Sequence, residues 1–196
     1  MSHGCCAGGP DTGALRTSSD WNCQHGSTNG GAARCVCGKT RLKRTQRPMK
    51  ISEHFTLEEF SFSEAAVRLG LDNTPIPIVI TNLGLMAAAM ERIRTLLGNR
   101  PIVVRSGYRS AAVNQAVGGV TTSAHCYGLA CDFVCPAFGT PAEVALTILK
   151  SGIEYDQLIL EYGWVHVGLA HEGLLSRREA LTKRSAWAAY EPGIRA

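Results

Sequence analysis

Two short segments of the chain carry side chains that could together bind a metal ion and activate a water molecule. The first segment contains His125 and Asp132, and the second contains Glu161 and His166. A hydrolytic zinc site needs three protein ligands, an open position for water and a nearby base that takes a proton from that water. Two imidazoles and one carboxylate would be the ligands, and the second carboxylate would be the base. The sequence therefore predicts a metallohydrolase, provided that the fold brings the two segments together.

The carboxylate of Asp132 is the part of this pattern that most favours a cation. It lies between a cysteine and a phenylalanine in an apolar segment that is typical of a strand. Burying a carboxylate there would cost several kcal/mol unless a cation or strong donors compensate. His166 alone would more often be a hydrogen-bonded core residue, and Glu161 alone would more often be a solvated carboxylate at a strand end. The hypothesis of a metal site therefore depends on the occurrence of these residues together in one chain.

An arginine after a short apolar segment adds a possible substrate contact. Arg109 follows Ser106-Gly-Tyr in a predicted turn. A guanidinium there can hold a carboxylate in a bidentate manner or stabilise a developing oxyanion. Taken alone, such an arginine is more often a surface loop residue. Arg105, still on the predicted strand, is the weaker candidate for this role.

The predicted elements are helices that precede and alternate with short strands, which indicates an α+β fold. Two capping boxes, each a threonine followed three residues later by glutamate, predict helix starts. The expected helices cover residues 56–69, 80–97, 111–117 and 140–150, and the expected strands cover 101–105, which should be buried, 129–134, 157–160 and 164–169. The last two strands should form a hairpin across Tyr162-Gly163. The pattern of residues 177–196 favours neither a helix nor a strand.

The composition divides the chain near residue 49. Of the 20 basic and 16 acidic side chains, eight basic and two acidic ones fall in the first 50 residues, so the remainder is slightly acidic. Residues 1–48 are rich in glycine, serine, threonine and arginine without hydrophobic periodicity, which predicts a disordered extension, and residues 49–196 are expected to form one domain. No apolar run has the length of a membrane span, and no signal peptide is evident.

The extension itself allows two alternatives to simple disorder. Its five cysteines, with Cys23-Gln-His25 and Cys35-Val-Cys37, could bind a metal, although the spacing matches no ordinary zinc knuckle. Its basic residues could contact nucleic acid, but they lack interleaved aromatic residues, so nucleic acid is not the expected partner.

Three motifs together resemble the M15 family of zinc peptidases, the D-Ala-D-Ala carboxypeptidase and dipeptidase group, and especially its compact, often phage-encoded branch. They are Ser106-Gly-Tyr-Arg109-Ser, Ser123-x-His125-x-x-Gly128-x-Ala130-x-Asp132 and Trp164-Val-His166-Val. Segments 52–60 and 177–182 are also similar to that branch. The resemblance covers roughly residues 50–195, and it implies a hedgehog-like fold with a small antiparallel sheet, helices packed on it and one zinc ion at the sheet face.

The resemblance also implies a role for each residue of the site. His125, Asp132 and His166 would bind zinc. Glu161 would be the general base, although His171 or Glu172 could compete for this role because Glu161 lies five positions before the last histidine, further than in related enzymes. Arg109 would stabilise the anionic intermediate, and Ser123 and Tyr108 would contact substrate. Cys131 should point away from Asp132 into the core, whereas Cys126, beside a ligand, would be open to oxidation.

The implied reaction is hydrolysis of peptidoglycan stem peptides by a zinc-activated water. It would be of the D-Ala-D-Ala carboxypeptidase or endopeptidase type, as in an endolysin. The protein would be a monomer, made in the cytoplasm, that acts at the cell wall or in the periplasm. The alternative is a module of the same fold that keeps zinc for binding or structure without turnover.

Overall fold

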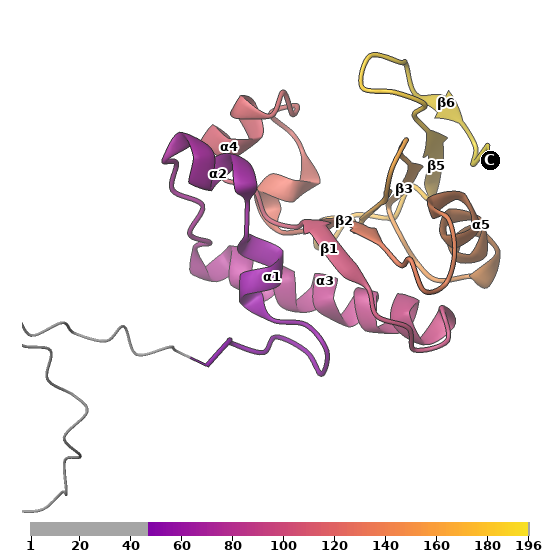
Figure 1. Cartoon of the computed structure of the whole chain (residues 1–196), viewed down its shortest axis with the longest axis horizontal. Helices are drawn as coiled ribbons and strands as arrows, with labels where there is room; N and C mark the ends of the chain where they lie inside the picture. Colours follow the sequence, from indigo (N-terminus) through magenta and orange to yellow (C-terminus); the bar gives the residue numbers. More distant parts are fainter. Residues whose placement is uncertain (1–46, 196) are drawn as a thin grey trace, which may run out of the picture. The chain divides into compact units, whose positions relative to one another are not determined.

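The computed structural model describes residues 47–195, so the predicted extension and its cysteines lie outside the described residues, apart from Arg47 and Pro48. The helices are α1 (Leu57–Ser61), α2 (Glu64–Leu69), α3 (Pro77–Leu96), α4 (Ala111–Ala116), the 3-10 helix η1 (Ala124–Tyr127) and α5 (Pro141–Ser151). The strands are β1 (Val103–Ser106), β2 (Ala130–Val134), β3 (Gln157–Leu160), β4 (Val165–Gly168), β5 (Glu179–Thr182) and β6 (Glu191–Pro192) (Figure 1).

The strands form one sheet in the order β1-β2-β4-β3-β5-β6. The α+β class and the hairpin of β3 and β4 are confirmed. The sheet is antiparallel, as expected, at every pair except one, where β5 runs parallel to β3. The chain reverses direction after β4 and then passes to the far side of β3, so its next strand runs the same way as β3. The segment from residue 177 onward, left open by its sequence pattern, supplies β5 and β6.

Local sequence explains where the helices begin and end. The threonine of each capping box accepts a hydrogen bond from the N3 backbone amide, and the glutamate accepts one from the threonine backbone, so both boxes are confirmed. The predicted helix from residue 56 to 69 is wrong as a single element. Phe62 adopts an extended conformation after α1, and Ser63 caps α2 by accepting a hydrogen bond from Ala66. α3 begins earlier than predicted because Pro77 occupies its first turn.

One face of the central strands packs on helices. The alternate residues Phe133, Val165, Val167 and Leu158 belong to the hydrophobic core together with the buried side of α3 and α5. Figure 1 shows α3 along one side of the molecule, with α5 near the C-terminal end of α3. The opposite face of the same strands is therefore free to carry polar side chains. No helix within residues 47–195 is long and apolar enough to cross a membrane.

The first strand is less buried than expected. β1 pairs only with β2 in the described sheet and forms its edge, and Val103 is 47% exposed. The strand nevertheless matters for the site, because it leads directly into the turn of Gly107, Tyr108 and Arg109.

Candidate metal centre

The polar face of the sheet brings together His125, Asp132 and His166. Asp132 on β2 and His166 on β4 are direct partners across an antiparallel ladder, so their side chains project to the same side. His125 reaches them from η1. This helix ends at Gly128 in the left-handed conformation, with φ of 71°, and the chain then turns back into β2. The predicted convergence of the two segments is confirmed.

The three side chains are spaced as ligands of one metal ion would be. The Nδ1 of His166 lies 2.7 Å from Oδ1 of Asp132, and the Nε2 of His125 lies 3.3 Å from that oxygen and 3.2 Å from the His166 Nδ1. A tetrahedral zinc ion with bonds of about 2.1 Å separates its ligand atoms by about 3.4 Å. All three residues are buried. The residues present therefore fit a zinc ion.

A backbone carbonyl orients the first histidine. The Nδ1–H of His125 donates a hydrogen bond of 2.6 Å to the carbonyl oxygen of Gly107, which leaves the lone pair on Nε2 for a metal. The importance of this glycine was not predicted from sequence. The one available signal was its place in Ser106-Gly-Tyr-Arg109, directly after a strand. A Cβ at position 107 would collide with the carbonyl oxygen of Phe60.

Replacement of Gly107 by alanine should weaken both folding and metal binding. The added methyl group would displace the turn from the Phe60 backbone and with it the carbonyl that holds His125. We expect a loss of about 1–3 kcal/mol in the free energy of unfolding and about 10–100-fold in zinc affinity. Denaturant unfolding and competition with a chelator measure the two effects. The control is Gly84→Ala on α3, where a Cβ meets nothing within 4 Å; equal zinc affinity of the two variants would contradict the role of the carbonyl.

The electrostatics of the cluster favour ligands in their metal-binding forms. Burial alone would raise the pKa of Asp132, but the two neighbouring imidazoles outweigh it, and the pKa of Asp132 is lowered. Burial lowers the pKa of His125, even though Asp132 acts in the opposite direction. An ionised carboxylate and a neutral imidazole are the forms that bind zinc.

Arg109 lies at the edge of the same cluster. Its Nη2 is 3.8 Å from Oδ2 of Asp132, and its backbone N–H donates to the carbonyl oxygen of His125. The side chain is only 19% exposed, and its buried Nε has no hydrogen-bond partner among the described residues. Arg109 is therefore a partly buried cation beside the candidate ligands rather than a surface loop residue.

Glu161 lies on the same face of the sheet as the ligands. It follows Ile159, the β3 partner of His166, by two residues, and side chains two apart in an extended segment share a face. Its backbone N–H donates to the carbonyl oxygen of Trp164 across the hairpin turn. The carboxyl group is half-buried; this burial raises its pKa, although the charge of Lys183 lowers it in part.

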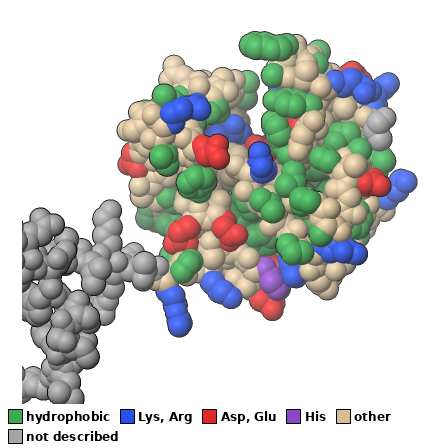
Figure 2. Space-filling view, in the orientation of Figure 1, with side chains coloured by type: hydrophobic (Ala, Val, Ile, Leu, Met, Phe, Trp, Pro, Cys, Tyr) green, Lys and Arg blue, Asp and Glu red, His purple; other side chains and the backbone are tan. Residues whose placement is uncertain are grey.

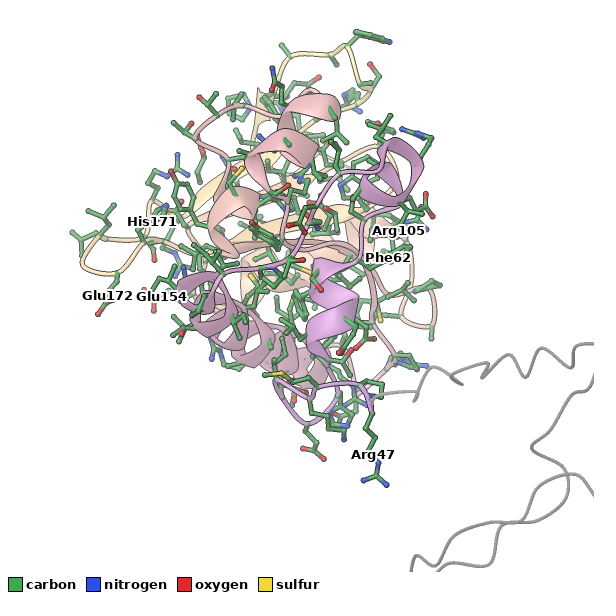
Figure 3. The ribbon with its side chains drawn as sticks, turned by 90° about the vertical axis from the view of Figure 1, so that its left-hand side faces the viewer. Arg47, Phe62, Arg105, Glu154, His171 and Glu172 are labelled. Carbon is green, nitrogen blue, oxygen red and sulfur yellow. The ribbon has the colours of Figure 1, made fainter. Side chains whose placement is uncertain are left out.

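The competing candidates for the base lie on an exposed loop. His171 and Glu172 are both exposed, on a loop that projects from one edge of the molecule in Figure 3. The ring of His171 stacks edge-on against Tyr127, 4.6 Å away between centroids. Arg105 is also exposed and lies toward the opposite edge in that view. Glu161, on the same face of the sheet as the ligands, is therefore a better candidate for the general base than His171 or Glu172. Arg109, beside Asp132, is a better candidate for the contact with the oxyanion than Arg105.

The two residues predicted to contact substrate differ in accessibility. Ser123 is the N-cap residue of η1 and is partly exposed. Tyr108 is only 8% exposed and belongs to the hydrophobic core. Burial raises the pKa of the Tyr108 hydroxyl. Ser123 therefore has more surface to offer a ligand than Tyr108.

The cysteines near the site follow the strand alternation. Cys131 is fully buried and belongs to the core, on the side of β2 away from Asp132, as expected. Cys126, next to His125, is partly exposed and forms no disulfide with another cysteine of residues 47–195. Burial raises the pKa of Cys126, so the less reactive protonated form is favoured.

Comparisons with known proteins agree with this geometry. A family model described as Peptidase M15 matches residues 53–168, which include the three candidate ligands, Arg109 and Glu161. The zinc D-Ala-D-Ala carboxypeptidase of Streptomyces albus G is 42% identical to this chain over 43 residues. The aligned segment makes up 22% of this chain and 17% of that protein, so it spans less than a fifth of the relative's length.

Proposed function

Because this chain belongs to the M15 family of zinc peptidases, we propose that it hydrolyses stem peptides of peptidoglycan, as a D-Ala-D-Ala carboxypeptidase or endopeptidase. The observation that carries this proposal is the buried carboxylate of Asp132 between two imidazoles, with a second carboxylate on the same face of the sheet. The name of the relative from Streptomyces supports the substrate class, although the alignment covers a small part of that protein.

The proposed ligands are His125, Asp132 and His166, which together would hold one zinc ion. When bound, zinc acts as a Lewis acid and lowers the pKa of a water molecule toward neutrality. The protein would supply the remaining steps. Glu161 would take a proton from the attacking water and pass it to the nitrogen of the leaving amine. As negative charge develops on the carbonyl oxygen, the guanidinium of Arg109 would donate hydrogen bonds to it.

Two further residues near the metal site would position the peptide substrate. Ser123, at the start of η1, offers a hydroxyl next to the segment that carries His125. Tyr108, being largely buried, would act through its position in the turn before Arg109 more than through its own surface. We also propose that the protein belongs to the phage-encoded branch of the family and acts at the cell wall.

Digestion of purified cell walls tests this function directly. The zinc-loaded full chain should release new amino groups from peptidoglycan, and mass spectrometry of the released muropeptides should identify the cleaved bond. Loss of a terminal D-alanine indicates a carboxypeptidase, whereas cleavage of cross-links indicates an endopeptidase. Binding of one zinc ion without any release of amino groups would instead favour a non-catalytic module of the same fold.

Replacement of Arg109 by alanine should retain zinc but lower kcat by about 10²–10³, as expected for the loss of one donor to an oxyanion. The matched control is Arg105→Ala, which removes an exposed arginine from the neighbouring strand. Steady-state kinetics and metal analysis on both variants provide the comparison. Near-normal turnover by the Arg109 variant would remove this residue from the proposed mechanism.

A further inference from the structure

A row of side chains extends from the candidate metal centre toward the last strands of the sheet. Leu160 on β3 is paired with Thr182 on β5, and the backbone N–H of Lys183 donates to the carbonyl oxygen of Leu160. Lys183 is therefore the neighbour of Glu161 one strand further along. Since Lys183 also lies two residues after Leu181, which pairs with Ile159, it projects to the same face as Glu161.

Lys183 carries a positive charge that acts on the nearby carboxyl group of Glu161 but forms no close ion pair within residues 47–195. Its ammonium lies 4.8 Å from the centre of the Tyr190 ring, a contact that fixes the side chain without neutralising its charge. Within residues 47–195, no carboxylate lies within 4.0 Å of it. Two other basic residues of the C-terminal segment do form ion pairs, since Arg184 contacts Glu191 at 3.1 Å and Arg177 contacts Asp156 at 2.6 Å. Lys183 is also only partly exposed, so an anion bound to it would be partly shielded from water.

The strands β5 and β6 that carry this row lie beside a hollow in the molecular surface. Figure 2 shows a hollow between the part of the molecule with α2 and α4 and the part with β5 and β6, and hydrophobic side chains gather on the latter. Tyr162 and Trp164 stack edge-on at 4.9 Å on the hairpin turn beside Glu161. Lys183 and Tyr190 lie beyond residues 53–168, the part that the family model matches.

We propose that Lys183 binds a carboxylate of the peptide substrate, on the side of Glu161 away from the zinc ligands. This inference rests on the proposed function, and it assigns to the β5–β6 hairpin the recognition of an acidic group in the peptide. The carboxylate is either the C-terminus of the peptide or an acidic side chain. With Arg109 at the ligands and Lys183 beyond Glu161, a peptide across the site would meet one cation on each side of the base.

Peptides that differ in one carboxylate test this assignment. Three synthetic stem peptides are compared: one with both carboxylates free, one with the C-terminus amidated and one with the acidic side chain amidated. For the wild-type zinc-loaded protein, amidation of the recognised group should raise KM about 10–100-fold, the usual cost of a lost hydrogen bond to a charged group. Lys183→Gln should abolish this difference in KM, and Lys183→Arg should retain most of it. Because the charge of Lys183 lowers the pKa of Glu161, the acidic limb of Lys183→Gln should move to higher pH, so the peptides are compared at a pH above that limb.

Control variants separate carboxylate binding by Lys183 from a general effect of lysine loss and from a positioning role toward Glu161. Lys150→Gln removes an exposed lysine at the end of α5 and should leave the KM ratio unchanged. A KM ratio in Lys183→Gln equal to that of the wild type would overturn the proposal. At a pH above the acidic limb, an equal fall in kcat for all three peptides with an unchanged KM ratio would also overturn it and would make Lys183 a positioning residue for Glu161.

A failure of the proposed function would be recognised separately. If the wild type cleaves none of the peptides, calorimetric titration of the same zinc-loaded protein with the three peptides still decides the role of Lys183. Tighter binding of one free acid than of its amide by the wild type, lost in Lys183→Gln, would support the carboxylate subsite. Equal affinities for acid and amide would overturn it.

Discussion

Replacing Asp132 with alanine should abolish stoichiometric zinc binding and reduce peptide hydrolysis below detection. The carboxylate lies within 3.3 Å of the ligand nitrogens of both histidines, so its removal takes away one of three protein ligands and the negative charge of the set. Loss of a group that merely supports a ligand costs about 10–100-fold in metal affinity. Loss of a ligand should cost more, and we expect at least about a thousandfold weaker binding.

Metal analysis after dialysis measures this effect, with circular dichroism as the check that the variant is folded. His125→Ala and His166→Ala should lose zinc in the same way. The matched control is Asp156→Ala, which removes a carboxylate that pairs with Arg177 outside the cluster and should keep one zinc per chain. An Asp132→Ala protein that retained one tightly bound zinc ion would show that Asp132 is not a ligand.

Much of this site could be predicted from the sequence because strand alternation is a local property. The alternation in β4 places His166 opposite the core valines, and the apolar neighbours of Asp132 indicate a buried carboxylate. The hairpin turn at Tyr162-Gly163 fixes which residues of β3 and β4 are partners. These features depend on residues that are close in the sequence, so patterns reveal them.

The features that escaped prediction depend on distant contacts. The hydrogen bond from His125 to Gly107 joins residues 18 positions apart, and nothing in the pattern of either segment identifies this partner. The parallel pairing of β5 with β3 arises from a crossover past the hairpin, which the weak hydrophobic pattern of residues 179–182 does not reveal. The exposure of Val103 follows from the edge position of β1, and an apolar segment looks the same at an edge as at the centre of a sheet.

The pH dependence of hydrolysis should reflect the environment of Glu161. Burial raises the pKa of this carboxyl group above its ordinary value of 4.5, and the charge of Lys183 opposes this only in part. A general base works in its ionised form, so kcat/KM should fall about tenfold per pH unit as the pH drops below the raised pKa. The acidic limb should therefore lie at a higher pH than that of a solvent-exposed glutamate.

Replacing Glu161 with glutamine should leave zinc bound but reduce kcat by about 10²–10⁴, the usual contribution of a general base. The amide is nearly isosteric but cannot accept a proton, so the half-buried position should tolerate it and the acidic limb of the pH profile should disappear. Turnover on purified cell walls, zinc content and the pH profile are measured together. Glu154→Gln, an exposed glutamate before β3, is the control and should behave as the wild type. Equal release of amino groups by Glu161→Gln and the wild type would remove Glu161 from the mechanism and require another base within reach of the attacking water.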